Sequence, residues 1–376
     1  GKVLSGEWGT DDETGNGIPV LRTTNFTNEG IVDYSNVVTR NIVKKGIEEK
    51  YLRNGDIIIE KSGGSDKQPV GRVIYFDGPG RTYLFNNFTG LLRVKNQEKW
   101  HPRYVFYSLF SNYRSGGTRT FQNKTTGLHN LKTDDYVSSF NVTENDIATQ
   151  EAICKKLDLV DGIIRMHQKQ LQKLDDLVKA RFVELFGDPV INPKGFPCYT
   201  VGEVIDFQGG SQPDKKYFEY EASPDNIRLI QIRDYKSEKY ITYIPKTMAK
   251  RFCTADDIMI GRYGPPIFQI LKGIEGSFNV ALMKATPKIG NKEFIRQFLK
   301  QDCLLEYLEG LSKRTAGQDG IQMDKLKAYP FPYPPIELQE QFATFVEQTD
   351  KSKAVIQKAL DEAQLLFDSL MQQYFG

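Results

Sequence analysis

The most regular pattern of hydrophobic positions lies in two long segments that contain no proline. Residues 150–187 align without a gap on residues 339–376, at a constant offset of 189, and apolar positions recur in alternating steps of four and three residues. This is the heptad period of paired helices. We therefore predict two long helices that pack along a shared seam, formed by Leu157, Val160, Ile164, Leu171, Leu174 and Val178 of the first segment and by Val346, Ile356, Leu360, Phe367 and Leu370 of the second.

The seam also includes polar residues, and the first series continues to Arg181 and Leu185. His167, Thr349 and Lys353 stand at seam positions, where a polar residue more often fixes the register of paired helices than binds a ligand. Globular and helical segments alternate along the chain, so the helices run antiparallel if they pair with each other. At 1.5 Å per residue, about 37 residues make a rod of roughly 55 Å, longer than one DNA turn of about 34 Å.

The segments outside the helices repeat more loosely. Their shared pattern is a short run of β-branched residues, a turn with Gly or Asn, and another such run, which is typical of strands. The matching pairs are 18–26 with 227–235, 55–64 with 256–265, and 127–136 with 320–329. Short helices are also predicted near 102–112 and near 292–309.

These elements together predict an α+β fold with a pseudo-two-fold repeat. Two β-rich mixed domains are separated by two long antiparallel coiled-coil helices. The predicted boundaries are 1–143 for the first domain, 144–187 for the first helix, 188–335 for the second domain and 336–376 for the second helix.

Length and composition agree with two packed domains. The chain has 376 residues, of which 39% are hydrophobic and 12% aromatic, enough to build two cores. Its apolar runs, such as Ile57–Ile59, are far shorter than the roughly 20 residues that span a bilayer, and no secretory signal opens the chain. We expect a cytoplasmic protein with no membrane association.

The cysteines and histidines offer little material for a metal or redox site. Cys154, Cys198, Cys253 and Cys303 include no close pair of the kind that binds zinc. The chain has only 3 histidines, none of them near a cysteine. We expect four buried free thiols and no metal.

Charge separates the helices from the globular segments. Residues 144–187 hold 7 Lys/Arg and 8 Asp/Glu, and residues 336–376 hold 3 and 7. The helical segments therefore carry net charges of −1 and −4. Because the whole chain carries +2, the other 291 residues carry +7. A mild basic excess on the globular parts permits contact with phosphates.

Basic residues meet small and amide residues at predicted loop tips in both halves. Residues 114–120 (RSGGTRT) correspond to residues 312–318 (SKRTAGQ). Lys61–Gly64 corresponds to Arg262–Gly264, and both of these segments directly follow a repeated strand. Arg can read guanine, Asn and Gln can read adenine, and Ser, Thr and glycine amides hold phosphates. The candidate DNA contacts are Arg22, Asn25, Lys61, Ser62, Gly63, Arg72, Arg114, Arg119, Thr120 and Asn123 in the first half, and Arg233, Arg262, Tyr263, Lys313, Arg314, Thr315 and Gln318 in the second.

Across essentially its full length the chain resembles the specificity subunits of type I restriction-modification systems. The resemblance is carried by the helical repeat and by residues 181–196 (RFVELFGDPVINPKGF), 55–73 (GDIIIEKSGGSDKQPVGRV) and 320–342 (GIQMDKLKAYPFPYPPIELQEQF). It implies that each globular domain recognises one half of a split, asymmetric DNA site, while the conserved helices set the gap between the halves.

The resemblance also implies partners and the absence of catalysis. Two methyltransferase subunits dock on the helical region and a restriction and translocation subunit joins them. The specificity subunit itself has no catalytic site. S-adenosylmethionine, Mg and ATP are then expected only on the partner subunits.

The two halves differ from each other at two places. The first half has no counterpart to GDPVINPKGFPCYTVGEV (187–204) and the chain starts with Gly, so we expect an N-terminal piece to be missing. The first half also has VSSFNVT (137–143) where the second has PFPYPPI (330–336).

The residues argue against two kinds of enzyme. Asp56 and the pair Glu60-Lys61 suggest a metal-dependent nuclease, but that chemistry needs a residue between acid and lysine, so structural charges are expected. FPYPP (331–335) lacks the polar residue that amino-methyltransferases place before Pro-Pro, and no phosphate-binding glycine motif is present. A coiled-coil scaffold, whose helices pair between chains and whose globular domains bind protein or carbohydrate, stays open as the alternative.

Overall fold

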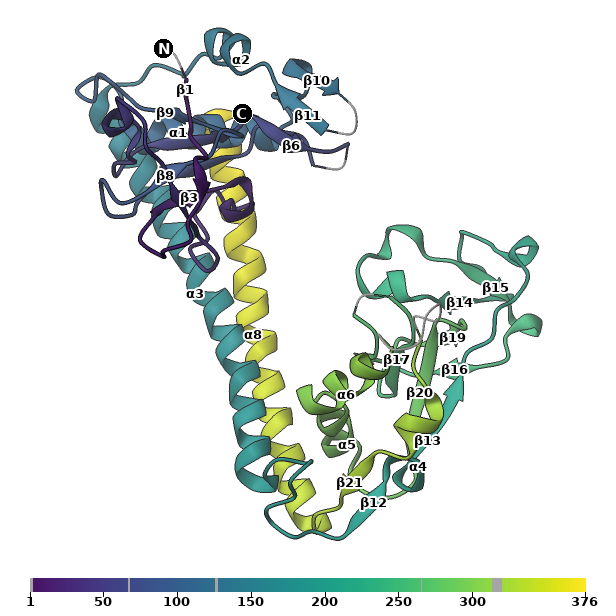
Figure 1. Cartoon of the computed structure of the whole chain (residues 1–376). Helices are drawn as coiled ribbons and strands as arrows, with labels where there is room; N and C mark the ends of the chain where they lie inside the picture. The colour runs from purple at the N-terminus through teal and green to yellow at the C-terminus, as the bar shows by residue number, and fades with distance from the viewer. Residues whose placement is uncertain (1–2, 67, 126–127, 265, 313–319) are drawn as a thin grey trace. The chain divides into compact units, whose positions relative to one another are not determined.

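The computed structural model describes residues 3–66, 68–125, 128–264, 266–312 and 320–376 (Figure 1). The chain forms two compact units, of which unit 1 contains Gly1–Lys169 and Gln357–Gly376 and unit 2 contains Gln170–Ile356. Two 40-residue helices, α3 (Ile147–Phe186) and α8 (Ile336–Phe375), each contribute one part to each unit. The division into four separate segments therefore remains a prediction, because contacts group each globular part with parts of both helices.

Unit 1 contains three small sheets, and a strand of one of them is buried on both faces. Ile57 and Ile59 of this strand, β5 (Ile57–Glu60), pack with α1 (Pro102–Arg114) and the long helices, whereas Ile58 faces a second cluster that includes Leu21 and Phe76. This split follows from the alternation of side chains along a strand. The sheet orders are β1 (Leu4–Ser5)–β9 (Thr89–Leu92)–β5–β7 (Val73–Tyr75), β2 (Thr10–Asp11)–β4 (Val38–Asn41)–β3 (Ile18–Leu21)–β8 (Leu84–Phe85), and β10 (Gln122–Thr125)–β11 (Leu128–Leu131)–β6 (Ser62–Gly64).

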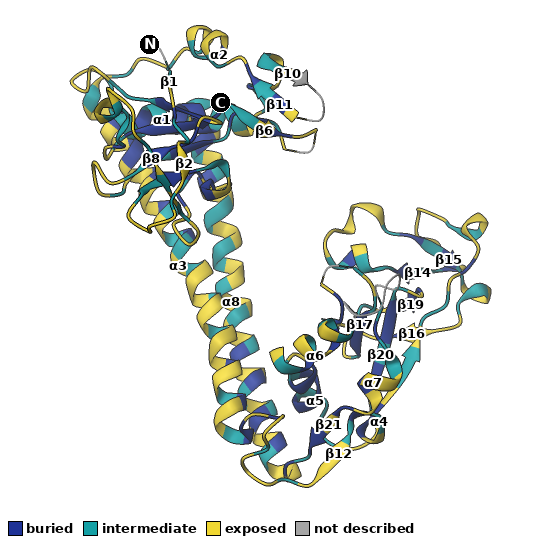
Figure 2. Ribbon diagram, viewed as in Figure 1, coloured by how far each residue is buried: buried dark blue, intermediate teal, exposed yellow. Residues whose placement is uncertain are grey.

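Unit 2 repeats this plan around β17 (Ile258–Gly261). Ile258 and Ile260 face the cluster of the helices, and Met259 faces the second cluster, with Ile230 and Phe278. Figure 2 shows the buried residues concentrated at the centre of each unit. The sheet orders are β13 (Ile205–Gly209)–β20 (Leu282–Pro287)–β17–β18 (Gln269–Lys272), β15 (Tyr243–Pro245)–β14 (Asn226–Ile230)–β19 (Gly276–Phe278)–β16 (Phe252–Cys253), and β12 (Cys198–Thr200)–β21 (Pro330–Pro332).

The shorter helices complete both units. Unit 1 has α1 and α2 (Thr133–Ser139), with single turns η1 (Thr23–Asn25), η2 (Ile47–Lys50) and η3 (Arg119–Phe121). Unit 2 has α4 (Val201–Val204), α5 (Lys292–Leu299), α6 (Asp302–Ser312) and α7 (Met323–Lys327), with single turns η4 (Lys215–Tyr217), η5 (Ile232–Tyr235), η6 (Glu238–Tyr240) and η7 (Lys246–Met248). The α+β prediction with two β-rich parts is confirmed, although the helix expected at 292–309 is two helices that part at Lys300 and Gln301.

The long helices pair antiparallel within each unit. In unit 2, Asp175 bonds Lys353 at 2.5 Å and Phe182 meets Phe342 further along α3 and earlier along α8. In unit 1, Lys156 lies 3.4 Å from the hydroxyl of Tyr374. The predicted seam residues Leu157, Val160, Ile164, Val178, Val346 and Phe367 are buried, while Leu171, Leu174, Ile356, Leu360 and Leu370 are half-buried.

The seam departs from the prediction where the second globular part covers it. The heptad series continued to Arg181 and Leu185, but Phe182 and Phe186 are the side chains that are almost fully buried there, at 1% and 5% exposure. Both rings contact Phe294 of α5. The core of unit 2 rather than the partner helix alone therefore decides which face of this end is buried.

The cysteines only partly follow the prediction of buried thiols. Cys154 and Cys253 are buried free thiols, and burial raises the pKa of Cys154 to about 12 and that of Cys253 to about 11. Cys198, by contrast, is exposed, because it lies on the two-stranded sheet β12–β21 at the surface, and Cys303 is only half-buried. Among the described residues, no helix has the length and apolar character to span a bilayer.

Candidate nucleic-acid interface

Two basic residues occupy the same place in the two units. Lys61 directly follows β5 and Arg262 directly follows β17. The backbone N–H of Lys61 donates to the carbonyl of Phe88 at 2.8 Å, and that of Arg262 donates to the carbonyl of Ala281 at 2.9 Å. The equivalence predicted from the repeated strands is therefore also present in the backbone hydrogen bonds.

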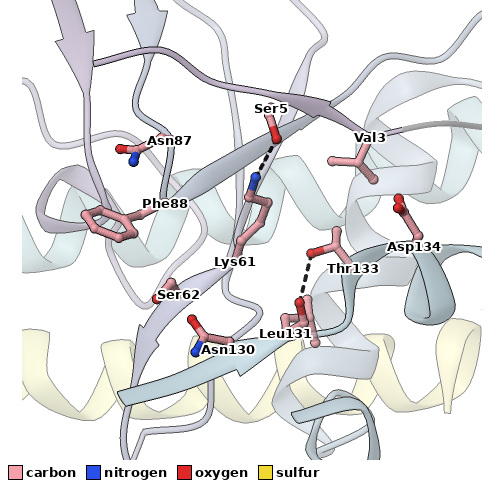
Figure 3. A pocket seen from close by; sticks show the side chains of 10 residues that line it. All are labelled: Val3, Ser5, Lys61, Ser62, Asn87, Phe88, Asn130, Leu131, Thr133 and Asp134. Carbon is pink, nitrogen blue, oxygen red and sulfur yellow. Dashed lines mark hydrogen bonds between the residues drawn. The ribbon is translucent and has the colours of Figure 1, made fainter. Parts of the chain in front are cut away.

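Lys61 lies in a polar hollow of about 470 Å³ on unit 1 (Figure 3). Its ammonium group donates to Ser5 Oγ at 2.7 Å, and burial lowers the pKa of Lys61, opposed by the charge of Asp134. A cation that has lost part of its hydration gains from an added anion or carbonyl group. The hollow is lined by Val3, Ser5, Lys61, Ser62, Asn87, Phe88, Asn130, Leu131, Thr133 and Asp134.

One small sheet brings several of the predicted residues together. Strand β11 pairs with β10 and with β6, so that Asn130 is the register partner of both Asn123 and Ser62. The register shifts between His129 and Asn130, opposite Gly63, whose φ of 125° favours glycine. Ser62, Gly63 and Asn123 therefore share one surface beside Lys61.

Arg119 and Thr120 stand in the single turn η3 that leads into this sheet. Both residues are exposed. The preceding Thr118 is fully buried and its hydroxyl donates to the carbonyl of Val70 at 2.8 Å. The bond of Thr118 thus fixes the loop to the interior of the unit, and Arg119 and Thr120 lie on the solvent side.

Two predicted contacts have internal roles instead. Asn25 is 1% exposed, and its amide accepts from the N–H of Arg22 and donates to the carbonyls of Asp33 and Asn36. The guanidinium of Arg72 binds Glu60 at 3.0 and 3.1 Å and two loop carbonyls besides. We correct the candidate set by removing both residues, because their polar groups already hold the loop and strand in place.

Arg22 and Arg114 are partly engaged within unit 1. Arg22 donates to the carbonyl of Asn36 at 3.4 Å. Arg114 forms an ion pair of 2.8 Å with Asp368 in which both side chains are about half exposed, at 40% and 43%. Neither contact prevents a side chain at the surface from exchanging partners, so both residues remain candidates.

The predicted residues of unit 2 are described only in part. The guanidinium of Arg262 lies 5.3 Å from the ring centroid of Tyr263, which is 48% exposed. Arg233 donates to Thr242 Oγ1 at 2.9 Å and its side chain is 50% exposed. The remaining candidates, Lys313, Arg314, Thr315 and Gln318, lie outside the described residues.

The sequence reading missed the residues opposite Lys61 and Arg262. In unit 1 these are Asn87, which is exposed, and Phe88, which is 50% exposed. In unit 2 the equivalent position of Asn87 is held by Val280, which is 39% exposed. The repeated pair Phe-Asn before Asn87 and before Val280 was the signal that could have found them.

The charges that suggested a nuclease have structural partners. Asp56 is 2% exposed and binds Arg93 at 2.6 and 2.7 Å, and Glu60 is 2% exposed and binds Arg72. Among the residues that the structure describes, no group of three or more His, Cys, Asp or Glu could hold a metal ion.

Comparison with known proteins places these features in a family context. A family model described as type I restriction modification DNA specificity domain matches residues 1–176 and 193–364. Two proteins of Methanocaldococcus jannaschii are each 23% identical to the chain: the putative type I restriction enzyme MjaX specificity subunit, over 91% of this chain and 84% of its own length, and the type I restriction enzyme MjaVIII specificity subunit, over 89% and 85%.

A solved structure has a similar fold. The S subunit of a type I restriction-modification system from M. genitalium matches with a TM-score of 0.57 at 15% sequence identity. The match covers 100% of this chain and 94% of that protein. At this level of identity the likeness concerns the fold.

Proposed function

This chain belongs to the type I restriction modification DNA specificity family, and from that premise we propose that it reads a bipartite, asymmetric site in double-stranded DNA. Each unit reads one half of the site. The chain also docks two methyltransferase subunits and a restriction subunit, which perform the chemistry.

The matched positions of Lys61 and Arg262 carry the DNA part of the proposal. Each follows the central strand of its unit and donates its backbone N–H to an equivalent carbonyl, that of Phe88 in unit 1 and that of Ala281 in unit 2. Their surroundings differ, with amides beside Lys61 and Tyr263 beside Arg262. A shared frame with different neighbours is what two recognition surfaces for two different half-sites require.

The flank of the long helices supports docking of two like partners. Exposed apolar residues recur there at the helical offset of 189: Met166 (49% exposed) corresponds to Val355 (71%), and Leu177 (47%) to Leu366 (50%). Unit 1 carries Met166 and Leu366, and unit 2 carries Leu177 and Val355. Equivalent apolar positions in both units suit two copies of one partner.

DNA reading is tested with the full chain in complex with its methyltransferase subunits. Duplexes with two random blocks and spacers of different lengths are bound at about 0.15 M salt, and the bound fraction is sequenced. We expect one split motif with one spacer length. A folded complex that binds all sequences alike would contradict the proposal and would favour the alternative, a coiled-coil scaffold.

Docking is tested by the mass of the assembled complex. The pairs Met166→Asp with Leu366→Asp, and Leu177→Asp with Val355→Asp, are each expected to lose one methyltransferase subunit, because a charge in an apolar interface is costly. Exposed polar positions of α8, one in each unit, serve as controls: Ser352→Asp and Gln373→Asp should leave the mass unchanged. Unchanged stoichiometry in both pairs would exclude this flank as the docking surface.

A further inference from the structure

Each unit presents one corner, where the chain passes from a strand of one sheet to a strand of another, β8 to β9 in unit 1 and β19 to β20 in unit 2, on an equivalent backbone frame. We call Phe85–Asn87 the corner of unit 1 and Phe278–Val280 the corner of unit 2. The N–H of Asn86 donates to a strand carbonyl at 2.9 Å, and that of Asn279 does so at 3.0 Å. Both asparagines are buried, at 4% and 9% exposure.

A glycine packs against each corner at the same point. An added Cβ on Gly6 would lie 2.1 Å from the carbonyl oxygen of Asn86, and one on Gly210 would lie 1.9 Å from that of Asn279. These approaches are closer than any real Cβ contact allows. The position of the corner backbone is therefore set by the fold and not by the residue that ends the corner.

The last residue of the corner is the one that changes. Asn87 ends the corner of unit 1 and Val280 ends that of unit 2, and neither side chain is buried. Each lies next to the carbonyl that binds the N–H of the basic residue, Lys61 or Arg262. Figure 3 shows Asn87 on the rim of the hollow that contains Lys61.

We propose that the last corner residue reads one base pair of each half-site. The amide of Asn87 pairs with adenine, which presents one acceptor and one donor in the major groove, and the methyl groups of Val280 contact the methyl group of thymine. This inference rests on the proposed function and adds to it the two residues and the bases that they select. The fixed frame explains how one position can change its specificity without disturbing the fold.

The test exchanges the two residues. The complex with methyltransferase is prepared with Asn87→Val and, separately, with Val280→Asn, and both are taken through the selection from random duplexes described above. Asn87→Val is expected to lose about tenfold in preference for adenine at one position of one half-site. Val280→Asn is expected to change one position of the other half-site, from thymine toward adenine.

Controls separate base reading from other effects. Asn54→Val and Val190→Asn make the same exchanges at exposed positions that do not line the hollow, and they should leave the motif unchanged. Thermal melting of each variant shows whether the fold is intact.

Each outcome decides between the two levels of the hypothesis. If the wild-type complex selects a split motif and the corner variants select the same motif, the corner proposal is wrong and the proposed function stands. If a corner variant binds every sequence more weakly and by the same factor, the residue contacts phosphate and the corner proposal is also wrong. If the wild-type complex selects no motif, the proposed function itself fails.

Discussion

The two units anchor equivalent helices, α1 in unit 1 and α5 in unit 2, in the same way but fill the space between these helices and the long helices differently. The buried Gln150 accepts from the N–H of His101 just before α1, and the buried Gln339 accepts from the N–H of Asn291 just before α5, each at 2.9 Å. Five residues further along stand Phe106 in unit 1 and Arg296 in unit 2.

In unit 1 that space contains aromatic rings packed around one ion pair, Arg103–Asp158, whereas in unit 2 most of the side chains that line it are charged or polar. In unit 1, Tyr107 meets Phe367 of α8, in a cluster with Phe106 and Phe110. In unit 2 the corresponding faces enclose a hollow of about 330 Å³ lined by charged and polar side chains, among them Glu293, Arg296, Lys300, Asp350 and Lys353.

The difference shows which features the repeat must keep. The glutamine anchors satisfy buried backbone groups, which any sequence on this frame has to do. The space between helices can be filled mainly by rings, of which only the Tyr107 hydroxyl takes a polar partner, Asp158. It can also be filled by charges, which need one partner each: Arg296 binds Glu293 at 2.6 Å and Lys353 binds Asp175. Duplicated backbone thus allows different cores.

The largest effect is expected from the ring cluster at the end of unit 2. Phe342 is fully buried against Phe182 and Phe186, at centroid distances of 5.6 and 5.3 Å. Phe342→Ala should lower the free energy of unfolding by about 3–5 kcal/mol, measured by urea denaturation. Phe342→Ile, which installs the residue found at the matched Ile153 of unit 1, should cost clearly less; an equal cost would mean that the ring contacts are not what stabilises this end.

Loss of a glutamine anchor should destabilise less than loss of the Phe342 ring, and should destabilise unit 1 more than unit 2. Gln150 makes three hydrogen bonds and Gln339 makes two. Gln150→Ala and Gln339→Ala should each lower the free energy of unfolding by about 1–3 kcal/mol, because a buried backbone N–H is left unpaired. Faster hydrogen exchange at His101 or Asn291 would report the loss locally, and Gln168→Ala, at an exposed position of α3, is the control. No change in exchange at either amide would refute the shared anchor.

DNA affinity provides a smaller and more selective comparison. Arg119→Ala in unit 1 and Arg262→Ala in unit 2 should each weaken specific binding by about 1–3 kcal/mol and relax preference in one half-site only, if the side chain reads a base. Fluorescence anisotropy on duplexes altered in one half at a time measures this. Equal weakening on every sequence would assign the arginine to a phosphate.

The smallest effect is expected at Arg114, whose ion pair with Asp368 is exposed on both sides. Arg114→Ala should change the free energy of unfolding by less than about 1 kcal/mol. The same variant then measures the DNA contribution of Arg114 almost free of stability effects. Asp368→Ala, which keeps Arg114 and removes its partner together with a bond from Gln364, is the matched control. A loss of affinity in both variants would show that the ion pair rather than Arg114 itself matters for binding.

Much of the fold could be predicted from periodicity because helices depend on local spacing. The predicted helices at 144–187 and 336–376 are found at Ile147–Phe186 and Ile336–Phe375. The repeated segments 55–64 and 256–265 contain equivalent central strands, since a strand that is buried on both faces reads as a continuous apolar run. The docking of partners and the split DNA site remain predictions of the resemblance.

The sequence by itself determined the duplication, the two long helices and the strands that Lys61 and Arg262 directly follow. Only the tertiary structure decided that Arg72 and Asn25 face inward, that Phe182 rather than Arg181 is buried, and that Asn87 and Val280 lie opposite the basic residues. The physical reason is the distance along the chain over which each kind of information acts. Periodicity records which face of an element avoids water, whereas a polar side chain chooses its partner among residues that only the folded chain brings near, as Arg72 does with Glu60 and with carbonyls 46 and 49 residues away.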